Sequence, residues 1–413
     1  MKFRTKLTAL LLVIAMLAVM VIGMSSCNKT DIPDGTERGT TTAFETTTAY
    51  ETTTAEQTTT VEETTASEET TTVEETTATN TESSDPTESA YLDELFANKT
   101  ELRFDENGEF RILVLSDLHI ISGGLFGRVI GYIRRLLERE KPDLIILNGD
   151  NVTDSSISSE KEFERSLRML TNILEKENIY WMHVFGNHDG EMSVTLEQQQ
   201  AIYESFEHCL SKDPVKELTG VGNYVIPIYG SDSDEVKFAV WGIDSNSYLS
   251  AEDRNAMFSQ NATGFNGYEG TQYDYIHFDQ IEWYREVSEL MESELGNKIP
   301  GLMAFHIPLQ ESHTAWMNRE GCEWTGSKRE PVCASPYNSG FFEVLRQRGD
   351  IKAVCNGHDH VNDYMVNYAG IKLCYASSIS TTTYSDSVGA RVFVINESDP
   401  SNVETYISYL FEE

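Results

Sequence analysis

Positive charge is scarce in this chain of 413 residues, which has 31 lysines and arginines against 67 aspartates and glutamates and a net charge of −36. A nucleic-acid-binding protein needs a basic surface to meet the phosphate backbone. Residues 101–413 have 25 basic against 50 acidic residues and no basic cluster beyond Arg134-Arg135. We therefore expect no nucleic-acid partner, and nuclease activity is disfavoured.

Cysteine is also scarce, and none of the six cysteines forms a Cys-x-x-Cys pair. A closed structural zinc site usually needs such pairs, so this kind of metal site is disfavoured. Five cysteines follow Cys27, which leaves at least one thiol free. Cys322 and Cys333 bracket a polar loop and could form a disulfide outside the cell, whereas Cys355 and Cys374 lie in apolar strand patterns and are expected to pack.

Apolar side chains are nearly missing from residues 29–90, where threonine and glutamate alternate in near repeats. So few apolar groups cannot offset the entropy lost on folding, and we predict a disordered linker over residues 28–98. Residues 28–100 have 17 acidic and three basic residues. Because like charges favour an extended chain, the segment is expected to act as a spacer.

The long apolar run of this chain lies at its N-terminus, where three basic residues precede Leu7 to Met24 and Ser25-Ser26-Cys27 follows. This is the layout of a secretory signal, and the small residues before Cys27 resemble a bacterial lipobox. We predict a lipoprotein signal peptide over residues 1–27, with a lipidated Cys27 holding the protein on the outside of the cell membrane. If the signal is not cleaved, the same run could span the membrane as an anchor with the remainder still outside.

Alternating strand and helix patterns fill residues 99–413, which predicts one α/β domain. Strands are predicted over 110–116, 143–147, 179–185, 221–228, 236–243, 301–305, 351–355, 363–367, 371–375, 391–395 and 403–409. Helices are predicted over 125–137, 160–177, 196–210 and 276–295.

Five of these strands end in residues that can bind metal ions. In chain order they are Asp117-x-His119, Gly149-Asp150, Gly186-Asn187-His188-Asp189, His306 and Gly357-His358-Asp359-His360. Carboxylate, amide and imidazole ligands suit Mn, Fe or Zn, and open α/β sheets place their sites at the carboxyl ends of strands. Each residue alone has an ordinary alternative such as a helix N-cap or a turn. No folding requirement explains the set, so we predict a catalytic metal site.

Other polar residues are less informative. Four histidines lack any motif context and are expected to be ordinary: His183, His208, His277 and His313. Three residues lie near the ligand loops, and a site role and a surface role both stay open for them: Asp154, Asn338 and Asn362.

The five motifs, in this order over about residues 110–362, resemble the calcineurin-like metallophosphoesterase superfamily. The resemblance implies a four-layer α/β/β/α sandwich of two mixed sheets flanked by helices, with two divalent or trivalent metal ions. Asp150 would bridge the ions. The first ion would also be bound by Asp117, His119 and His360. The second ion would also be bound by Asn187, His306 and His358.

The resemblance also implies a mechanism. A water molecule shared by the ions would lose a proton and attack phosphorus in line, while the cations absorb the charge on the phosphoryl oxygens. His188 would bind no metal and would supply a proton or hydrogen bond to the leaving group. Asp189 would orient the His188 ring.

This chain differs from two branches of the superfamily at motif positions, which indicates the branch that it resembles most. Purple acid phosphatases have a tyrosine three residues after the bridging aspartate, where this chain has Thr153, and they lack a histidine at the position of His119. Calcineurin-type phosphatases have an arginine soon after Gly-Asp, and residues 151–155 contain none. The chain is more similar to the purple-acid-phosphatase-like branch around the fungal dosage-dependent cell-cycle regulator phosphatase. The similar segments are 184–189, 306–309, 330–333, 338–340 and 357–363.

We therefore expect a surface-anchored phosphomonoesterase that acts on organic phosphates or phosphoproteins. A phosphodiesterase acting on nucleotides or lipid head groups is the alternative, because the same metal core serves both reactions. A non-catalytic binding domain is a third interpretation, against which the intact ligand set argues.

Overall fold

The structure is a computed structural model that describes residues 86–121, 126–258, 273–380 and 388–411. The predicted signal peptide and most of the predicted linker lie outside the described residues, so both stay predictions. Within the described ranges, no helix is long and apolar enough to cross a membrane.

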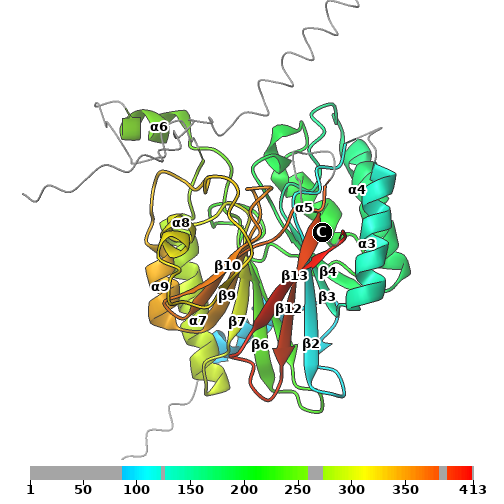
Figure 1. Ribbon diagram of the computed structural model, residues 1–413. Helices are drawn as coiled ribbons and strands as arrows, with labels where there is room; N and C mark the ends of the chain where they lie inside the picture. Colours follow the sequence, from blue (N-terminus) through cyan, green and yellow to red (C-terminus); the bar gives the residue numbers. More distant parts are fainter. Residues whose placement is uncertain (1–85, 122–125, 259–272, 381–387, 412–413) are drawn as a thin grey trace, which may run out of the picture. The chain divides into compact units, whose positions relative to one another are not determined.

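Two mixed β-sheets form the centre of the described domain (Figure 1). The larger sheet has eight strands in the order β1 (Leu102–Arg103), β5 (Tyr224–Tyr229), β6 (Val236–Gly242), β7 (Gly301–Ala304), β9 (Ile351–Asn356), β11 (Ile371–Tyr375), β10 (Met365–Tyr368) and β8 (Trp324–Thr325). The smaller sheet has five strands in the order β13 (Glu404–Tyr409), β12 (Gly389–Asn396), β2 (Glu109–Leu115), β3 (Leu144–Asn148) and β4 (Tyr180–Val184). Strands β2, β3 and β4 run parallel, as do β6, β7, β9 and β11.

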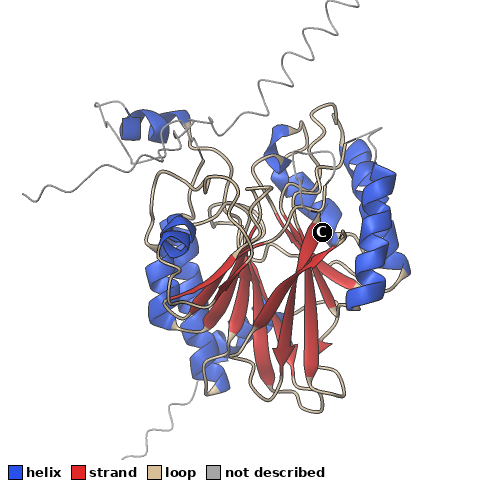
Figure 2. Cartoon of the chain, in the orientation of Figure 1, coloured by secondary structure: helices blue, strands red, loops and turns tan. Residues whose placement is uncertain are grey.

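Helices cover the outer face of each sheet (Figure 2). The smaller sheet is covered by α3 (Phe126–Glu140), α4 (Glu160–Lys176) and α5 (Leu196–Glu204). The larger sheet is covered by α2 (Pro86–Phe96), α7 (Phe278–Leu295), α8 (Gln310–Met317) and α9 (Phe341–Arg348). A further helix, α6 (Ala251–Phe258), and a short 3₁₀ helix, η1 (Asp189–Glu191), lie in loops. The predicted four-layer α/β/β/α sandwich is confirmed.

Three hydrophobic cores separate these four layers, one between the sheets and one under each helical layer. All five residues of β3 are buried, as expected for a parallel strand covered on both faces. Cys355 and Cys374 lie side by side on β9 and β11 in the core between the sheets, so the prediction that they pack is confirmed. Cys322 is a free thiol, and the possible Cys322–Cys333 disulfide is therefore not formed.

Two boundaries differ from the sequence predictions. Residues 86–96 were assigned to the linker but form α2, whose Leu92 and Leu95 are buried in the core under α7 and β5. The folded domain therefore begins before the predicted boundary. Helix α5 ends at Glu204 instead of continuing to residue 210, because residues 208 and 210 hydrogen-bond to the backbone of Trp181 beside β4.

Candidate dimetal site

Both sheets contribute residues to one buried cluster at the carboxyl ends of their strands. The smaller sheet provides Asp117 and His119 after β2, Asp150 after β3 and Asn187 after β4. The larger sheet provides His306 after β7, and His358 and His360 after β9. All the side chains predicted to bind metal are thus near this edge of the sandwich.

A first group of ligands comprises Asp117, His119, Asp150 and His360, each of which offers one ligand atom within 4.8 Å of the others. His360 Nε2 lies 3.3 Å from Asp117 Oδ1 and 3.2 Å from His119 Nε2. His119 Nε2 lies 3.6 Å from Asp150 Oδ2. The four possible ligand atoms therefore lie close enough together to bind one ion.

A second group comprises Asp150, His306 and His358, again within 4.8 Å of one another. His306 Nε2 lies 3.3 Å from Asp150 Oδ2, and its other ring nitrogen donates to the carbonyl oxygen of Asn148 at 2.8 Å. Asn187 uses its amide nitrogen to donate to the Tyr248 hydroxyl at 3.2 Å, which leaves its Oδ1 for an ion. Asp150 belongs to both groups.

The hydrogen bonding of the second group and of the neighbouring Asn187 gives a further reason to expect an ion there. Among the residues that the structure describes, Asn187 Oδ1 and His358 Nε2 are buried and have no hydrogen-bond partner, and His306 Nε2 has the Asp150 carboxylate 3.3 Å away. A buried polar atom without a partner costs about 1–3 kcal/mol. Two cations bound between these groups would satisfy these atoms and would also compensate the buried carboxylates of Asp117 and Asp150. We conclude that the chain has a buried His/Asp dimetal site.

Electrostatics prepares several of these groups for metal binding. Burial lowers the pKa of His119 to about 4 and that of His358 to about 3, so both rings are neutral near pH 7. Burial raises the pKa of Asp150, but His306 and His188 outweigh this and hold it well below its usual range. Burial likewise lowers the pKa of His306, but the charges of Asp150 and Asp117 outweigh it and raise the pKa to about 10. Neutral imidazole and ionised carboxylate are the forms that bind metal ions, so His119, His358 and Asp150 are ready for an ion, whereas His306 must first lose a proton.

The backbone of the ligand loops is strained. Four ligands adopt left-handed conformations that non-glycine residues seldom adopt, namely Asp117 (φ 54°), His119 (φ 45°), Asp150 (φ 50°) and His358 (φ 74°). Such a conformation costs on the order of 1–3 kcal/mol and persists only where surrounding contacts impose it. Here the amides of Asp117 and His119 donate to the carbonyl oxygens of Gly149 and Asp150, which ties two ligand loops together.

Glycines in the motifs make room for the ligands. A Cβ on Gly149, whose φ is +87°, would lie 2.3 Å from the His306 ring, and one on Gly186 would lie 2.4 Å from Asp150 Oδ1. A Cβ on Gly357 would lie 2.0 Å from Ser116 Oγ. The Gly-Asp, Gly-Asn and Gly-His pairs of the sequence are therefore explained by close packing around the site.

His188 lies at the rim of the cluster, with its ring centroid 5.5 Å from that of His119 and its side chain 31% exposed. Its Nδ1 lies 3.0 Å from Oε2 of Glu191, the last residue of the short helix η1, which His188 precedes. Burial lowers the pKa of His188, but the charge of Asp150 and the hydrogen bond to Glu191 outweigh it and raise the pKa to about 9. The ring can therefore hold a proton beside the metal ligands.

The prediction that Asp189 orients His188 is wrong. The Asp189 carboxylate is fully buried and accepts hydrogen bonds from backbone N–H groups instead. The donors are Asn151 and Val152 to Oδ1 and Gly186 to Oδ2. Asp189 therefore joins the loop after β3 to the loop after β4 and holds two metal-binding loops in register.

Sequence reasoning missed two residues of the site, Glu191 and Tyr248. Glu191 follows His188 by three residues, a spacing that places side chains together on a helical turn and was the signal available. Tyr248 has no such signal, because it reaches Asn187 from 61 residues away. Thr153, which stands where purple acid phosphatases have tyrosine, lies with its hydroxyl 3.2 Å from His119 Nδ1 and so orients that ligand.

The remaining candidates lie outside the two ligand groups. Asn362 is structural, since its Oδ1 accepts from the backbone of Arg329 and Glu330. Asp154 accepts from Ser156 in a turn. His183 is buried and stacks on Tyr203 at 3.4 Å, and His277 pairs with Asp274 at 3.1 Å. Burial lowers the pKa of His313, whose structural context adds no functional signal.

His208 lies near Glu175 and Glu207 in a third group of possible ligands. There, however, Glu175 already accepts from His208 Nδ1 at 2.9 Å and from Trp181 Nε1 at 2.9 Å. Because these contacts satisfy the carboxylate, we assign this group a structural role.

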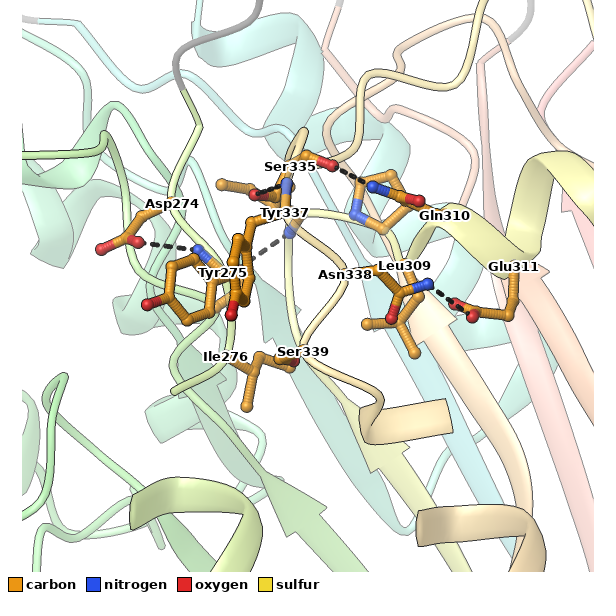
Figure 3. Close-up of a pocket in the computed structure, with 13 residues that line it drawn as sticks. Asp274, Tyr275, Ile276, Leu309, Gln310, Glu311, Ser335, Tyr337, Asn338 and Ser339 are labelled. Atoms are coloured by element: carbon orange, nitrogen blue, oxygen red, sulfur yellow. Dashed lines mark hydrogen bonds between the residues drawn. The ribbon is translucent and has the colours of Figure 1, made fainter. Parts of the chain in front are cut away.

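A small cavity is lined by residues of the loops that follow β6 and β7, among them Leu309 and Gln310 (Figure 3). Tyr275 and Tyr337 form one wall, with ring centroids 4.4 Å apart. Asn338 lies on another side and donates to Glu311 at 2.8 Å. The prediction left Asn338 open between site and surface, and the structure places it in the lining of this cavity, which includes none of the predicted metal ligands.

Comparisons with known proteins identify a family and several relatives of this chain. The calcineurin-like phosphoesterase family matches residues 110–362. The chain is 31% identical over 324 residues to a protein of Arabidopsis thaliana named probable inactive purple acid phosphatase 14, covering 71% of this chain and 76% of that protein. It is 28% identical to phosphatase DCR2 of Saccharomyces cerevisiae, covering 66% of this chain and 48% of that protein. Among solved structures, a dimetal phosphatase from Danio rerio is 14% identical with a TM-score of 0.45, covering 73% of this chain and 99% of that one.

Proposed function

The chain belongs to the calcineurin-like phosphoesterase family, and from that membership we propose that it is a dimetal phosphomonoesterase. Its substrates would be organic phosphate esters or phosphoproteins. The observation that carries the proposal is the position of Asp150, whose carboxylate belongs to both groups of ligands. A carboxylate placed in this way can hold two cations about 3.5–4 Å apart.

The two groups of side chains described above would each hold one ion. Asp117, His119 and His360 would hold one ion, and the second set, Asn187, His306 and His358, would hold the other. When bound, the ions would activate water as the nucleophile and stabilise the charge that develops on the phosphoryl oxygens.

His188 would act on the leaving group. It is the partly exposed histidine beside the ligands, and its Nδ1 is occupied by Glu191, which leaves Nε2 to carry the proton. A protonated imidazole there can supply a proton to the departing oxygen, an effect typically worth about 10²–10⁴-fold in rate. Substrates with poor leaving groups depend on it most.

The names of two relatives give opposite indications about whether this chain is catalytically active. The Arabidopsis relative is named probable inactive, whereas the yeast relative is named a phosphatase. We propose that this chain is active, because its cluster includes two buried carboxylates and, in the described part of the chain, two buried polar atoms without a partner, Asn187 Oδ1 and His358 Nε2. Such a cluster is costly unless cations bind to it.

The proposal is tested by metal analysis of the purified protein together with a panel of phosphate monoesters and diesters. We expect two ions per chain and faster turnover of monoesters. Faster turnover of diesters would replace the proposal by the phosphodiesterase alternative. Two bound ions with no turnover of either class would favour the non-catalytic interpretation.

We further propose that the enzyme works outside the cell, held to the membrane by a lipidated Cys27. The basic residues, apolar run and small residues before Cys27 support this location. Mass analysis of the protein from membrane fractions should find a lipid on Cys27 and no residues 1–26. If residues 1–26 are still attached, the lipoprotein proposal is contradicted, and the alternative in which the uncleaved apolar run spans the membrane as an anchor takes its place.

A further inference from the structure

Four side chains close a ring of hydrogen bonds at the rim of the dimetal site. Asn187 Nδ2 donates to the Tyr248 hydroxyl at 3.2 Å, and that hydroxyl donates to Glu191 Oε1 at 3.0 Å. The other carboxylate oxygen of Glu191 lies 3.0 Å from His188 Nδ1. Because Asn187 and His188 are neighbours in sequence, the ring begins and ends on the same turn of the chain.

The direction of these hydrogen bonds is determined by their chemistry. A carboxylate accepts and cannot donate when ionised, so both the Tyr248 hydroxyl and His188 Nδ1 must donate to Glu191. The Tyr248 oxygen is then left to accept from the amide nitrogen of Asn187. Glu191 thus sets the orientation of every group in the ring.

Two consequences concern the reaction. With Nδ1 of His188 donating to Glu191, the other ring nitrogen is left to act on a substrate, and the ring centroid lies 5.5 Å from that of the ligand His119. With its amide nitrogen donating to Tyr248, Asn187 keeps Oδ1 as the atom that would bind the second ion, and this oxygen is buried without a partner in the described part of the chain.

We propose that Glu191 and Tyr248 are positioning residues, which together orient His188 toward the leaving group and Asn187 toward the second ion. The part that concerns His188 rests on the proposed phosphoesterase function. The part that concerns Asn187 requires only that the site binds metal ions.

Neighbouring contacts hold the ring in place. Glu191 ends the η1 helix, whose first residue, Asp189, is anchored by backbone hydrogen bonds. The Tyr248 ring stacks on Tyr273 with centroids 5.7 Å apart, and the Tyr273 ring meets the edge of His358 at 4.4 Å. Tyr248 is therefore linked to two ligands of the second ion, Asn187 directly and His358 through Tyr273.

The first test is Tyr248→Phe, which keeps the ring and removes the hydroxyl. We expect the second Mn²⁺ or Zn²⁺ to bind about 10–100-fold more weakly, since partners that orient a metal ligand have effects of this size, while the first ion binds as before. Calorimetric titration of the metal-free full chain measures both ions without requiring turnover. Tyr337→Phe is the matched control, because Tyr337 lies in the cavity wall outside the ring and should leave both affinities unchanged.

The second test is Glu191→Gln, measured on aryl and alkyl phosphate monoesters. An alkyl alkoxide is a poor leaving group that needs the proton from His188, so kcat on alkyl phosphates should fall about 10–100-fold, with little change on activated aryl phosphates. Glu164→Gln is the matched control, because Glu164 forms an exposed pair with Arg168 on α4.

The outcomes separate this proposal from the proposed function. Equal loss on aryl and alkyl substrates would overturn the role of Glu191, and unchanged affinity for the second ion in Tyr248→Phe would overturn the role of Tyr248. If the wild-type chain hydrolyses no phosphate ester, the proposed function fails together with the His188 part, and the calorimetric titration still decides the Asn187 part. The double variant Tyr248→Phe/Glu191→Gln measures whether the two residues act together. If its loss of affinity for the second ion equals the sum of the losses in the two single variants, expressed as free energies, the residues are not coupled and the shared ring is contradicted.

Discussion

At the scale of single residues, the site depends most on Asp150, which is shared by both ligand groups. Asp150→Asn preserves its shape and the hydrogen bond from the His188 amide but removes the negative charge between the ions. We expect binding of both ions to be lost and turnover to fall on the order of a thousandfold or more, since several kcal/mol of charge stabilisation disappear. Metal analysis and steady-state kinetics measure the two effects.

The isosteric control for this variant is Asp234→Asn. Asp234 forms a surface pair with Arg103 and is 94% exposed in its side chain, so the change should affect neither metal content nor rate. Near-normal activity of Asp150→Asn would contradict the bridging role.

His306 makes metal binding depend on pH. In the metal-free protein its pKa is raised to about 10, so the ring is protonated at pH 7, with Nε2 beside Asp150. An ion can bind this nitrogen only after the proton leaves, so binding at pH 7 should release at least one proton. The apparent affinity should therefore rise about tenfold per pH unit for each proton released, below pH 10. Calorimetry in buffers of different ionisation enthalpy counts the protons, and a buffer-independent heat would rule out this account.

The folding stability of the metal-free protein changes with pH in the opposite direction to the metal affinity. A histidine with a raised folded-state pKa stabilises the fold below the unfolded value near 6.5, and this contribution is lost as the pH rises toward 10. Metal binding and protonation of His306 therefore compete for the same nitrogen.

Sequence alone located the residues that lie in motifs and missed those that do not. Asp117, Asp150 and His306 were recognised because each follows an apolar strand. Tyr248 was not, because its contact with Asn187 bridges 61 residues and leaves no periodic pattern. Asp189 was assigned to the wrong partner, since adjacency to His188 in sequence does not specify which way a side chain points.

At the scale of elements, strands in the cores were well predicted and surface elements less so. Strands such as β3 are apolar throughout because both faces are buried, and this composition is visible in the sequence. The two-residue strands β1 and β8 are too short to show a period. Helix α2 was missed because acidic and threonine residues continue into it from the linker, while two leucines provide its contact with the core.

Helix α2 provides a test of where the folded domain begins. Leu95 is 1% exposed and packs in the core under α7, so Leu95→Ala should lower the free energy of unfolding by about 2–3 kcal/mol. The carbonyl of Leu95 also accepts from Lys212, which ties the end of the helix to the domain. Urea denaturation of the full chain measures the loss. Glu94→Ala on the exposed face of α2 is the control, and equal stability of the two variants would mean that α2 does not belong to the domain.

At the scale of the whole described domain, the dimetal site joins two sheets that also meet through an apolar core and through hydrogen bonds such as that from Arg391 of β12 to the Tyr375 carbonyl of β11. Asp117, Asp150 and Asn187 belong to the smaller sheet, while His306 and His358 belong to the larger one. Each ion would therefore be bound by residues of both sheets. The strained backbone at four ligands also lies at this junction, where metal binding can offset its cost.

Removing the ions should thus destabilise the fold as well as stop turnover. A ligand at 100–1,000 times its Kd stabilises a protein by about 3–4 kcal/mol, so treatment with a chelator should lower the Tm by roughly 5–10 °C. Adding Mn²⁺ or Zn²⁺ back should restore the Tm, which calorimetry measures. Asp150→Asn provides the control, because a chain that binds no ions should melt at the same temperature with and without chelator. If the wild-type chain also melts unchanged, the ions contribute to the reaction alone, and the contact between the sheets is maintained by the apolar core and the hydrogen bonds between them.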